Sequence, residues 1–173
     1  MSRAGPENEG VPMLAVNTDS TAFKVLLFVH ILAAVAWIGG GIMITLMGER
    51  AKRARDEGEM VKVALNAEFW ALRFFIPMSL VLLACGIGMV SVGHVGFKPF
   101  VVVGLVGWVV SFAIGAGYLG PQSARLHGML AGDGSVTAAA VDQVNRIIWV
   151  ARADLVILVV IIASMAIQPG GGI

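Results

Sequence analysis

A histidine inside a long apolar run is the side chain whose type and position most clearly indicate chemistry. His30 lies within the run from Thr21 to Gly48, seven residues before Trp37 and shortly before three consecutive glycines. Residues seven apart fall on nearly the same face of a helix, so the imidazole and the indole are expected to point the same way. An ionisable side chain in hydrocarbon is costly unless it has a partner, which makes His30 the first candidate for a functional residue.

Two histidines from different helices can ligate the two faces of a haem b iron. His94 follows the second apolar run and is expected near the same membrane surface as the start of the first run, which contains His30. His127 is expected on the other side of the membrane. No Cys-x-x-Cys-His motif occurs, which excludes covalent haem attachment. Haem b is therefore a candidate cofactor, with His30 as metal ligand, His94 as second candidate, and Trp37 packing against the flat ligand or within the bundle. The alternative for His30 is a hydrogen bond to a serine, threonine or carbonyl of another helix.

Charged side chains inside the apolar runs form a second candidate site. Arg73 lies about one turn into the second run, and Arg152 and Asp154 lie one to two turns into the fourth. A short aspartate cannot extend to the membrane surface as an arginine can, so Asp154 needs a partner within the bundle. We expect an ion pair between Arg73 and Asp154, because Arg152 is two residues away and faces elsewhere. A proton or substrate site is the alternative.

Four apolar runs must position these side chains. Of the 173 residues, 58% are hydrophobic and 13% are charged, whereas soluble domains carry about 25% charge. Each run contains about 20 residues or more, enough to cross a hydrocarbon core roughly 30 Å thick. Only helices can satisfy the backbone of such single segments there. The runs cover about residues 21–48, 69–92, 98–119 and 147–168.

The predicted fold class is therefore all-α, an integral membrane four-helix transmembrane bundle over residues 21–169. Residues 1–20 are expected to form a disordered tail, because they combine prolines, glycines and acids without periodicity, and residues 170–173 a short C-terminal tail. Gly120 and Pro121 are expected to end the third helix, since proline lacks an N–H and glycine tolerates a helix-ending conformation. Residues 132–135 are expected to form a turn.

Positive charge predicts the orientation. The first and third connections carry seven lysines and arginines, against three near the opposite boundaries. Because basic connections stay in the cytoplasm, these two connections are predicted to be cytoplasmic and both termini outside. The expected partner is the lipid bilayer, and small-residue faces such as Ala36 with Gly40 could also support a homo-oligomer. No basic face with interleaved aromatic residues indicates nucleic-acid binding.

The segment from Val29 to Gly40 resembles the opening of a bacterial family of predicted four-helix integral membrane proteins, labelled domain of unknown function 2269. The segment from Asp154 to Pro169 is similar to that family's last helix, although Gln168 stands where the family often has lysine. The opening also resembles copper-resistance D proteins and HemJ-type protoporphyrinogen oxidases, in which a histidine followed by tryptophan and glycine is tied to haem b. His30 matches that histidine. The HemJ type uses a lysine of a later helix as partner, and the interiors of the later runs here contain none, which argues against oxidase activity.

These features predict a multi-pass protein of the bacterial inner membrane, the bacterial origin being implied by resemblance, that binds haem b through His30 in a redox or electron-transfer role. A non-enzymatic structural or partner-binding membrane protein is the alternative. A small transporter with Asp154 and Arg73 along its path is a third possibility. No phosphate loop, zinc motif or serine–histidine constellation is present, so the sequence favours a protein that is not an enzyme.

Overall fold

The computed structural model describes residues 18–130 and 136–168, and all regular structure among them is helical. Two π-helical segments, η1 and η2, join consecutive α-helices without a break, which leaves four continuous helices that are long and apolar enough to cross a membrane. The all-helical, four-helix part of the prediction is confirmed. The turn expected at 132–135, the tail expected at 170–173 and residues 1–17 of the tail expected at 1–20 lie outside the described residues. The elements are α1 (Thr21–Arg53), α2 (Glu57–Trp70), η1 (Ala71–Phe75), α3 (Ile76–Val92), α4 (Pro99–Phe112), η2 (Ala113–Leu119), α5 (Gly120–Leu130) and α6 (Ala138–Ile167).

Side-chain caps set three of the helix starts. The side chains of Ser20, Asp56 and Thr137 accept hydrogen bonds from backbone N–H groups three residues further on, at 2.9 to 3.3 Å. Each bond satisfies one of the N–H groups that the first turn of a helix leaves without an internal partner.

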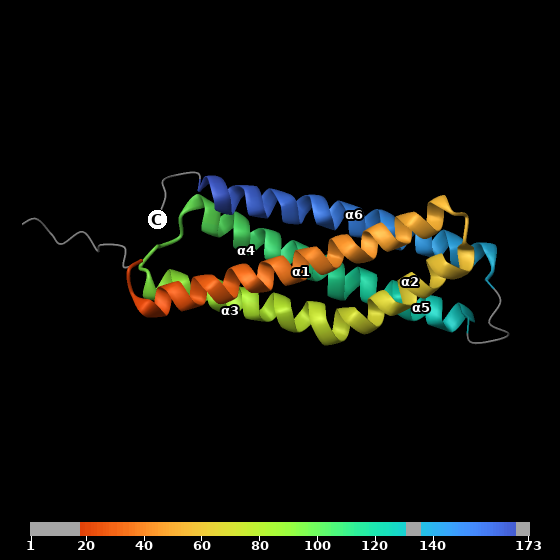
Figure 1. Ribbon diagram of the computed structural model, residues 1–173, viewed down its shortest axis with the longest axis horizontal. Coiled ribbons are helices and arrows are strands. Elements are labelled where there is room, and N and C mark those ends of the chain that lie inside the picture. Colours follow the sequence, from red (N-terminus) through yellow and green to blue (C-terminus); the bar gives the residue numbers. More distant parts are fainter. Residues whose placement is uncertain (1–17, 131–135, 169–173) are drawn as a thin grey trace, which may run out of the picture.

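The helices form two hairpins that lie side by side in an elongated bundle (Figure 1). In the first hairpin α1 packs mainly on α3, and in the second α4 packs mainly on α6. The start of α1, the end of α6 and the connection from α3 to α4 lie at one end of the bundle. The opposite end contains α2, α5 and the adjoining parts of α1 and α6, and we call it the crown.

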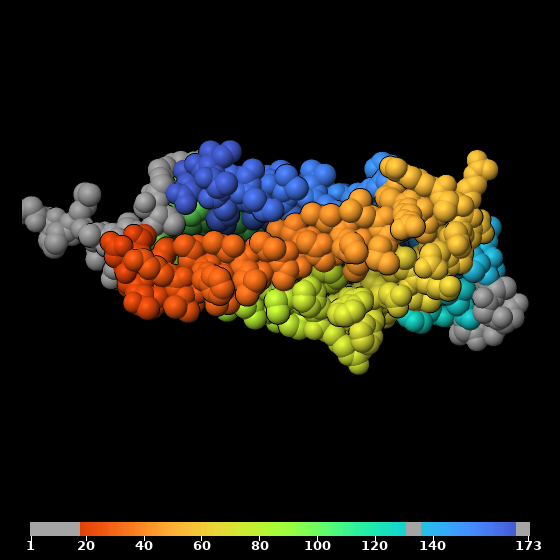
Figure 2. All heavy atoms as spheres, in the orientation of Figure 1, coloured from red at the N-terminus to blue at the C-terminus, as the bar shows by residue number. Residues whose placement is uncertain are grey.

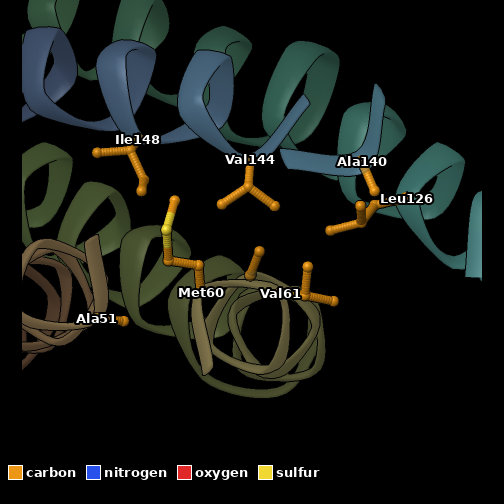
Figure 3. Close-up of a cluster of buried hydrophobic side chains, with 8 residues drawn as sticks. Ala51, Met60, Val61, Leu126, Ala140, Val144 and Ile148 are labelled. Atoms are coloured by element: carbon orange, nitrogen blue, oxygen red, sulfur yellow. The ribbon is translucent and has the colours of Figure 1, made fainter. Parts of the chain in front are cut away.

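A hydrophobic cluster fills the crown. Met60 and Val61 of α2 face Val144 and Ile148 of α6, with Leu126 of α5 beside them (Figure 3). Leu126 and Val144 are completely buried. All four long helices continue beyond the predicted spans at this end, and their apolar side chains are buried against one another there.

Away from the crown, the exterior of the bundle is apolar. Phe28, Val35, Leu72 and Val156 each expose 64 to 66% of their surface. Within the most apolar stretch of each long helix, only 6 to 17% of the residues are buried. The helix α1 runs along the visible face from the far end to the crown (Figure 2). Extended apolar surface of this kind marks contact with a membrane or another protein.

Glycines allow helices of the same molecule to approach one another closely. A Cβ atom added at Gly40 would lie 2.9 Å from the Phe75 ring, and one added at Gly107 would lie 2.5 Å from the side chain of Ile161. The small-residue faces are thus used for packing within the monomer. Whether they also support a homo-oligomer stays a prediction.

The expectation that Gly120 and Pro121 end the third helix is wrong. The helix continues to Leu130, and the π-helical segment η2 directly precedes Gly120. Proline normally breaks a helix because it has no N–H and its ring clashes with the carbonyl four residues earlier. Here that carbonyl belongs to Gly117, inside η2, where the wider π turn replaces the regular ladder and accommodates the ring.

The close approach of α4 and α6 predicts the effect of one substitution. Gly107→Val places methyl groups where Ile161 already packs, so it should destabilise the fold by about 1–3 kcal/mol, as overpacked sites do. Gly39→Val is the matched control, because no atom lies within 4 Å of a Cβ added there. Thermal unfolding in mild detergent should show a lower midpoint for the first variant alone. Equal midpoints would contradict the packing described here.

Candidate functional site

His30 joins the two helices of the first hairpin. Its Nδ1 lies 2.9 Å from the carbonyl oxygen of Leu82 on α3, and Gly86, one turn further on, lies beside the ring. A carbonyl can only accept a hydrogen bond, so Nδ1 carries the proton and donates it. This contact is the interhelical hydrogen bond that the sequence offered as the alternative to haem ligation.

The other two predicted cofactor residues do not meet His30. His94 lies beyond the end of α3, exposed, in a turn with φ of 50°. Leu82 and the end of α3 at Val92 are ten residues apart, about 15 Å along a helix. Both axial nitrogens must bond to one iron, so His30 and His94 do not fit a shared haem. Trp37, two turns from His30 along α1, faces a different region.

That region is a cavity between the two hairpins, with a volume of about 180 Å³. Trp37 and Thr45 of α1, Ser79 of α3, Ser111 of α4 and Asp154 of α6 lie along its wall. The rest of the lining is mostly apolar, and residues of both π-helical segments contribute to it. All four long helices therefore build this site.

Among the described residues, three buried polar atoms of the cavity lining have no hydrogen-bond partner, namely Ser111 Oγ, Asp154 Oδ1 and Glu68 Oε2. Of these, Ser111 Oγ and Asp154 Oδ1 also have no ion-pair partner, whereas Glu68 Oε2 lies beside His127. Ser111 is 1% exposed. The Ser111 hydroxyl and the Asp154 carboxyl both belong to the cavity wall, but Ser111 Oγ and Asp154 Oδ1 do not reach hydrogen-bond geometry. By contrast, the hydroxyls of Thr45 and Ser79 donate to carbonyl oxygens of their own helices at 2.8 Å. The cavity therefore presents one free hydroxyl and one free carboxylate oxygen.

The predicted ion pair between Arg73 and Asp154 does not form. The guanidinium of Arg73 lies over the ring of Phe69, 4.3 Å from its centre, and the side chain is exposed. Arg152 points away from Asp154 and pairs with Glu49 of α1. Both nearby cations thus have other partners, because residues that are close in sequence on a helix point in different directions.

The crown side of the cavity carries a second carboxylate. Glu68 belongs to the cavity lining, and its Oε2 lies 2.7 Å from Nδ1 of His127 on α5. The Glu68 side chain is 23% exposed and that of His127 is 56% exposed. The cavity therefore extends from the apolar part of the bundle to a level where a carboxylate begins to meet solvent.

Sequence reasoning missed Ser111 as a polar residue of the site, since a lone serine in an apolar helix carries no signal of its orientation. It also missed the two π-helical segments, although the positions of two prolines in the sequence indicate them. Pro77 follows η1 by two residues and Pro121 follows η2 by two residues. A proline inside a long apolar run indicates a distortion of the preceding turn, and π turns are frequent at functional sites.

The fold and the site together define a class of protein, namely a four-helix bundle with an apolar exterior and a partly polar internal cavity. Comparison of the chain with protein-family models, with curated proteins and with solved structures finds no match in any of the three.

A double-mutant cycle can test the ion pair between Arg152 and Glu49, which leaves Asp154 without a cationic partner. Glu49 is 17% exposed at its side chain, so Arg152→Gln should destabilise the fold by leaving a largely buried carboxylate unpaired. Together with Glu49→Gln it should show a coupling of about 0.5–3 kcal/mol in thermal or denaturant unfolding. The exposed pair of Lys62 with Glu59 is the control, for which little coupling is expected. Additive effects at Glu49 and Arg152 would contradict the pairing.

Proposed function

We propose that this chain is a multi-pass protein of the bacterial inner membrane that binds a small molecule in the cavity between its two hairpins. Four helices of sufficient length and apolarity support insertion in a bilayer. The seven basic residues of the first and third connections are all exposed, at or near the crown, which favours a cytoplasmic crown. These residues are Arg50, Lys52, Arg53, Arg55, Lys62, Arg125 and Arg146.

The observation that carries this proposal is the pair of polar atoms, Ser111 Oγ and Asp154 Oδ1, that have neither a hydrogen-bond nor an ion-pair partner in the wall of a mostly apolar cavity. A buried polar group without a partner costs about 1–3 kcal/mol, and a charged one costs more. Alanine or leucine at both positions would remove that cost if the bundle only had to be stable. A ligand that bonds to both atoms would offset it, and a concave apolar site with a few convergent polar groups is the usual form of a small-molecule site.

Binding of benzene-sized compounds tests the proposal. Titration calorimetry on protein in mild detergent, corrected for protein-free micelles, should show saturable binding of at least one of 2-phenylethylamine, 2-phenylethanol and phenylacetate. Gly115 lines the cavity and has no atom within 4 Å of an added Cβ, so Gly115→Leu should fill space and abolish that binding. Gly39→Leu, outside the lining, should leave binding intact. No saturable binding of any of the three compounds would refute the proposal.

Haem b binding through His30 alone is a second candidate. Donation from Nδ1 to the Leu82 carbonyl leaves the lone pair of Nε2 free, and metal-bound histidines commonly donate their other N–H to such an acceptor. No described residue bonds to Nε2. In this arrangement His30 would hold the iron, whose redox chemistry the haem supplies, and a second axial ligand would not be His94.

Visible spectroscopy tests this candidate directly. Protein expressed with ample haem should show a Soret band and a reduced-minus-oxidised difference spectrum if His30 ligates the iron. His30→Ala should abolish both, whereas His94→Ala should leave both unchanged. Absence of a Soret band in the unsubstituted protein would eliminate haem binding.

A further inference from the structure

We infer that the cavity selects a small organic cation, a protonated amine carried on a compact apolar or aromatic body. This inference rests on the proposed function and adds the chemical class of the ligand. The charge balance of the cavity wall is its starting point. The described lining contains two carboxylates, Asp154 and Glu68, and no lysine, arginine or histidine. Glu68 has His127 as a partner outside the lining, so Asp154 is the carboxyl group of the lining that has no cationic side chain beside it.

The cations that could neutralise Asp154 from within the chain are held elsewhere. Arg152 is bound to Glu49, and Arg73 lies over Phe69. Neither residue lines the cavity. In a site with little water, an unbalanced charge attracts an opposite charge far more strongly than it would in bulk solvent. A cationic ligand is therefore the counter-ion that this arrangement lacks.

The two free acceptors suit an ammonium group. An alkylammonium has three N–H donors and no acceptor. Asp154 Oδ1 and Ser111 Oγ, on facing helices α6 and α4, can each accept one of these hydrogen bonds. An anionic ligand would instead bring two negative charges together, and a neutral alcohol would leave the carboxylate charge uncompensated.

The remaining wall suits an apolar body of limited size. The aromatic side chains Trp37, Phe75 and Phe112 lie in the lining, and aromatic rings favour both apolar groups and cations. A cavity of about 150 Å³ accommodates benzene, so the volume of about 180 Å³ allows a phenyl ring with a short chain. A metal ion fits less well, because the described residues contain no group of three or more His, Cys, Asp or Glu side chains able to hold one.

Matched ligands of one shape test the inference. Calorimetric titration of the unsubstituted protein should give about tenfold or greater preference for 2-phenylethylamine over 2-phenylethanol, since hydrogen bonds to charged groups are worth about that factor or more. Asp154→Asn should weaken amine binding about tenfold to a hundredfold and change alcohol binding by less than about twofold. Asp142→Asn, at an exposed position of the same helix, should change neither.

Each outcome decides the inference. Equal affinity for amine and alcohol, or an unchanged amine affinity in Asp154→Asn, overturns cation selectivity while cavity binding itself stands. Preferential binding of phenylacetate overturns it as well. The absence of binding by all three compounds refutes the proposed function and the inference with it. The comparison of ligands on the unsubstituted protein keeps the test decisive even if Asp154→Asn fails to fold.

Discussion

The two prolines inside the apolar helices, Pro77 and Pro121, impose the constraint on which the centre of the bundle depends. Neither can donate a backbone hydrogen bond, and each ring would clash with a carbonyl of the preceding turn in a regular α-helix. The chain passes both residues through a π-helical segment, one in each hairpin. Ala71 and Phe75 of η1, with Gly115 and Leu119 of η2, then face the same space. Both π-helical segments therefore contribute to the wall of the cavity.

Three contacts of polar side chains connect the long helices. His30 bonds to α3 through the Leu82 carbonyl, Trp108 of α4 donates to the carbonyl of Ser79 at 3.0 Å, and Arg152 of α6 pairs with Glu49 of α1. These three contacts tie all four long helices together, two of them across the boundary between the hairpins. The last of these contacts also holds Arg152 against Glu49, so that this arginine does not pair with Asp154.

The four helices could be predicted from run length and hydropathy, because a bilayer-length apolar run has few other conformations. The interhelical hydrogen bond of His30 was among the alternatives that the residue type allowed. The partner of Asp154 could not be predicted, since it depends on the rotation of α6 and on Glu49, which the sequence placed in a connection. The prediction that the third helix ends at Pro121 was wrong because a proline ends some helices and only distorts others. His94 could be placed near the same end as His30, but not shown to face outward.

The bundle is also mechanically uneven. Eight buried apolar residues lock the crown, together with the hydrogen bond between Gln143 and Gln122, whereas three buried residues, Phe23, Val95 and Phe100, form the cluster at the far end. Regions with fewer buried contacts open at lower free energy. The two hairpins are therefore held together by more buried apolar side chains at the crown than at the far end, where the connection from α3 to α4 joins them. Because the cavity lining includes crown residues such as Met60 and Val144, the cavity lies toward the end of the bundle that opens at the higher free energy.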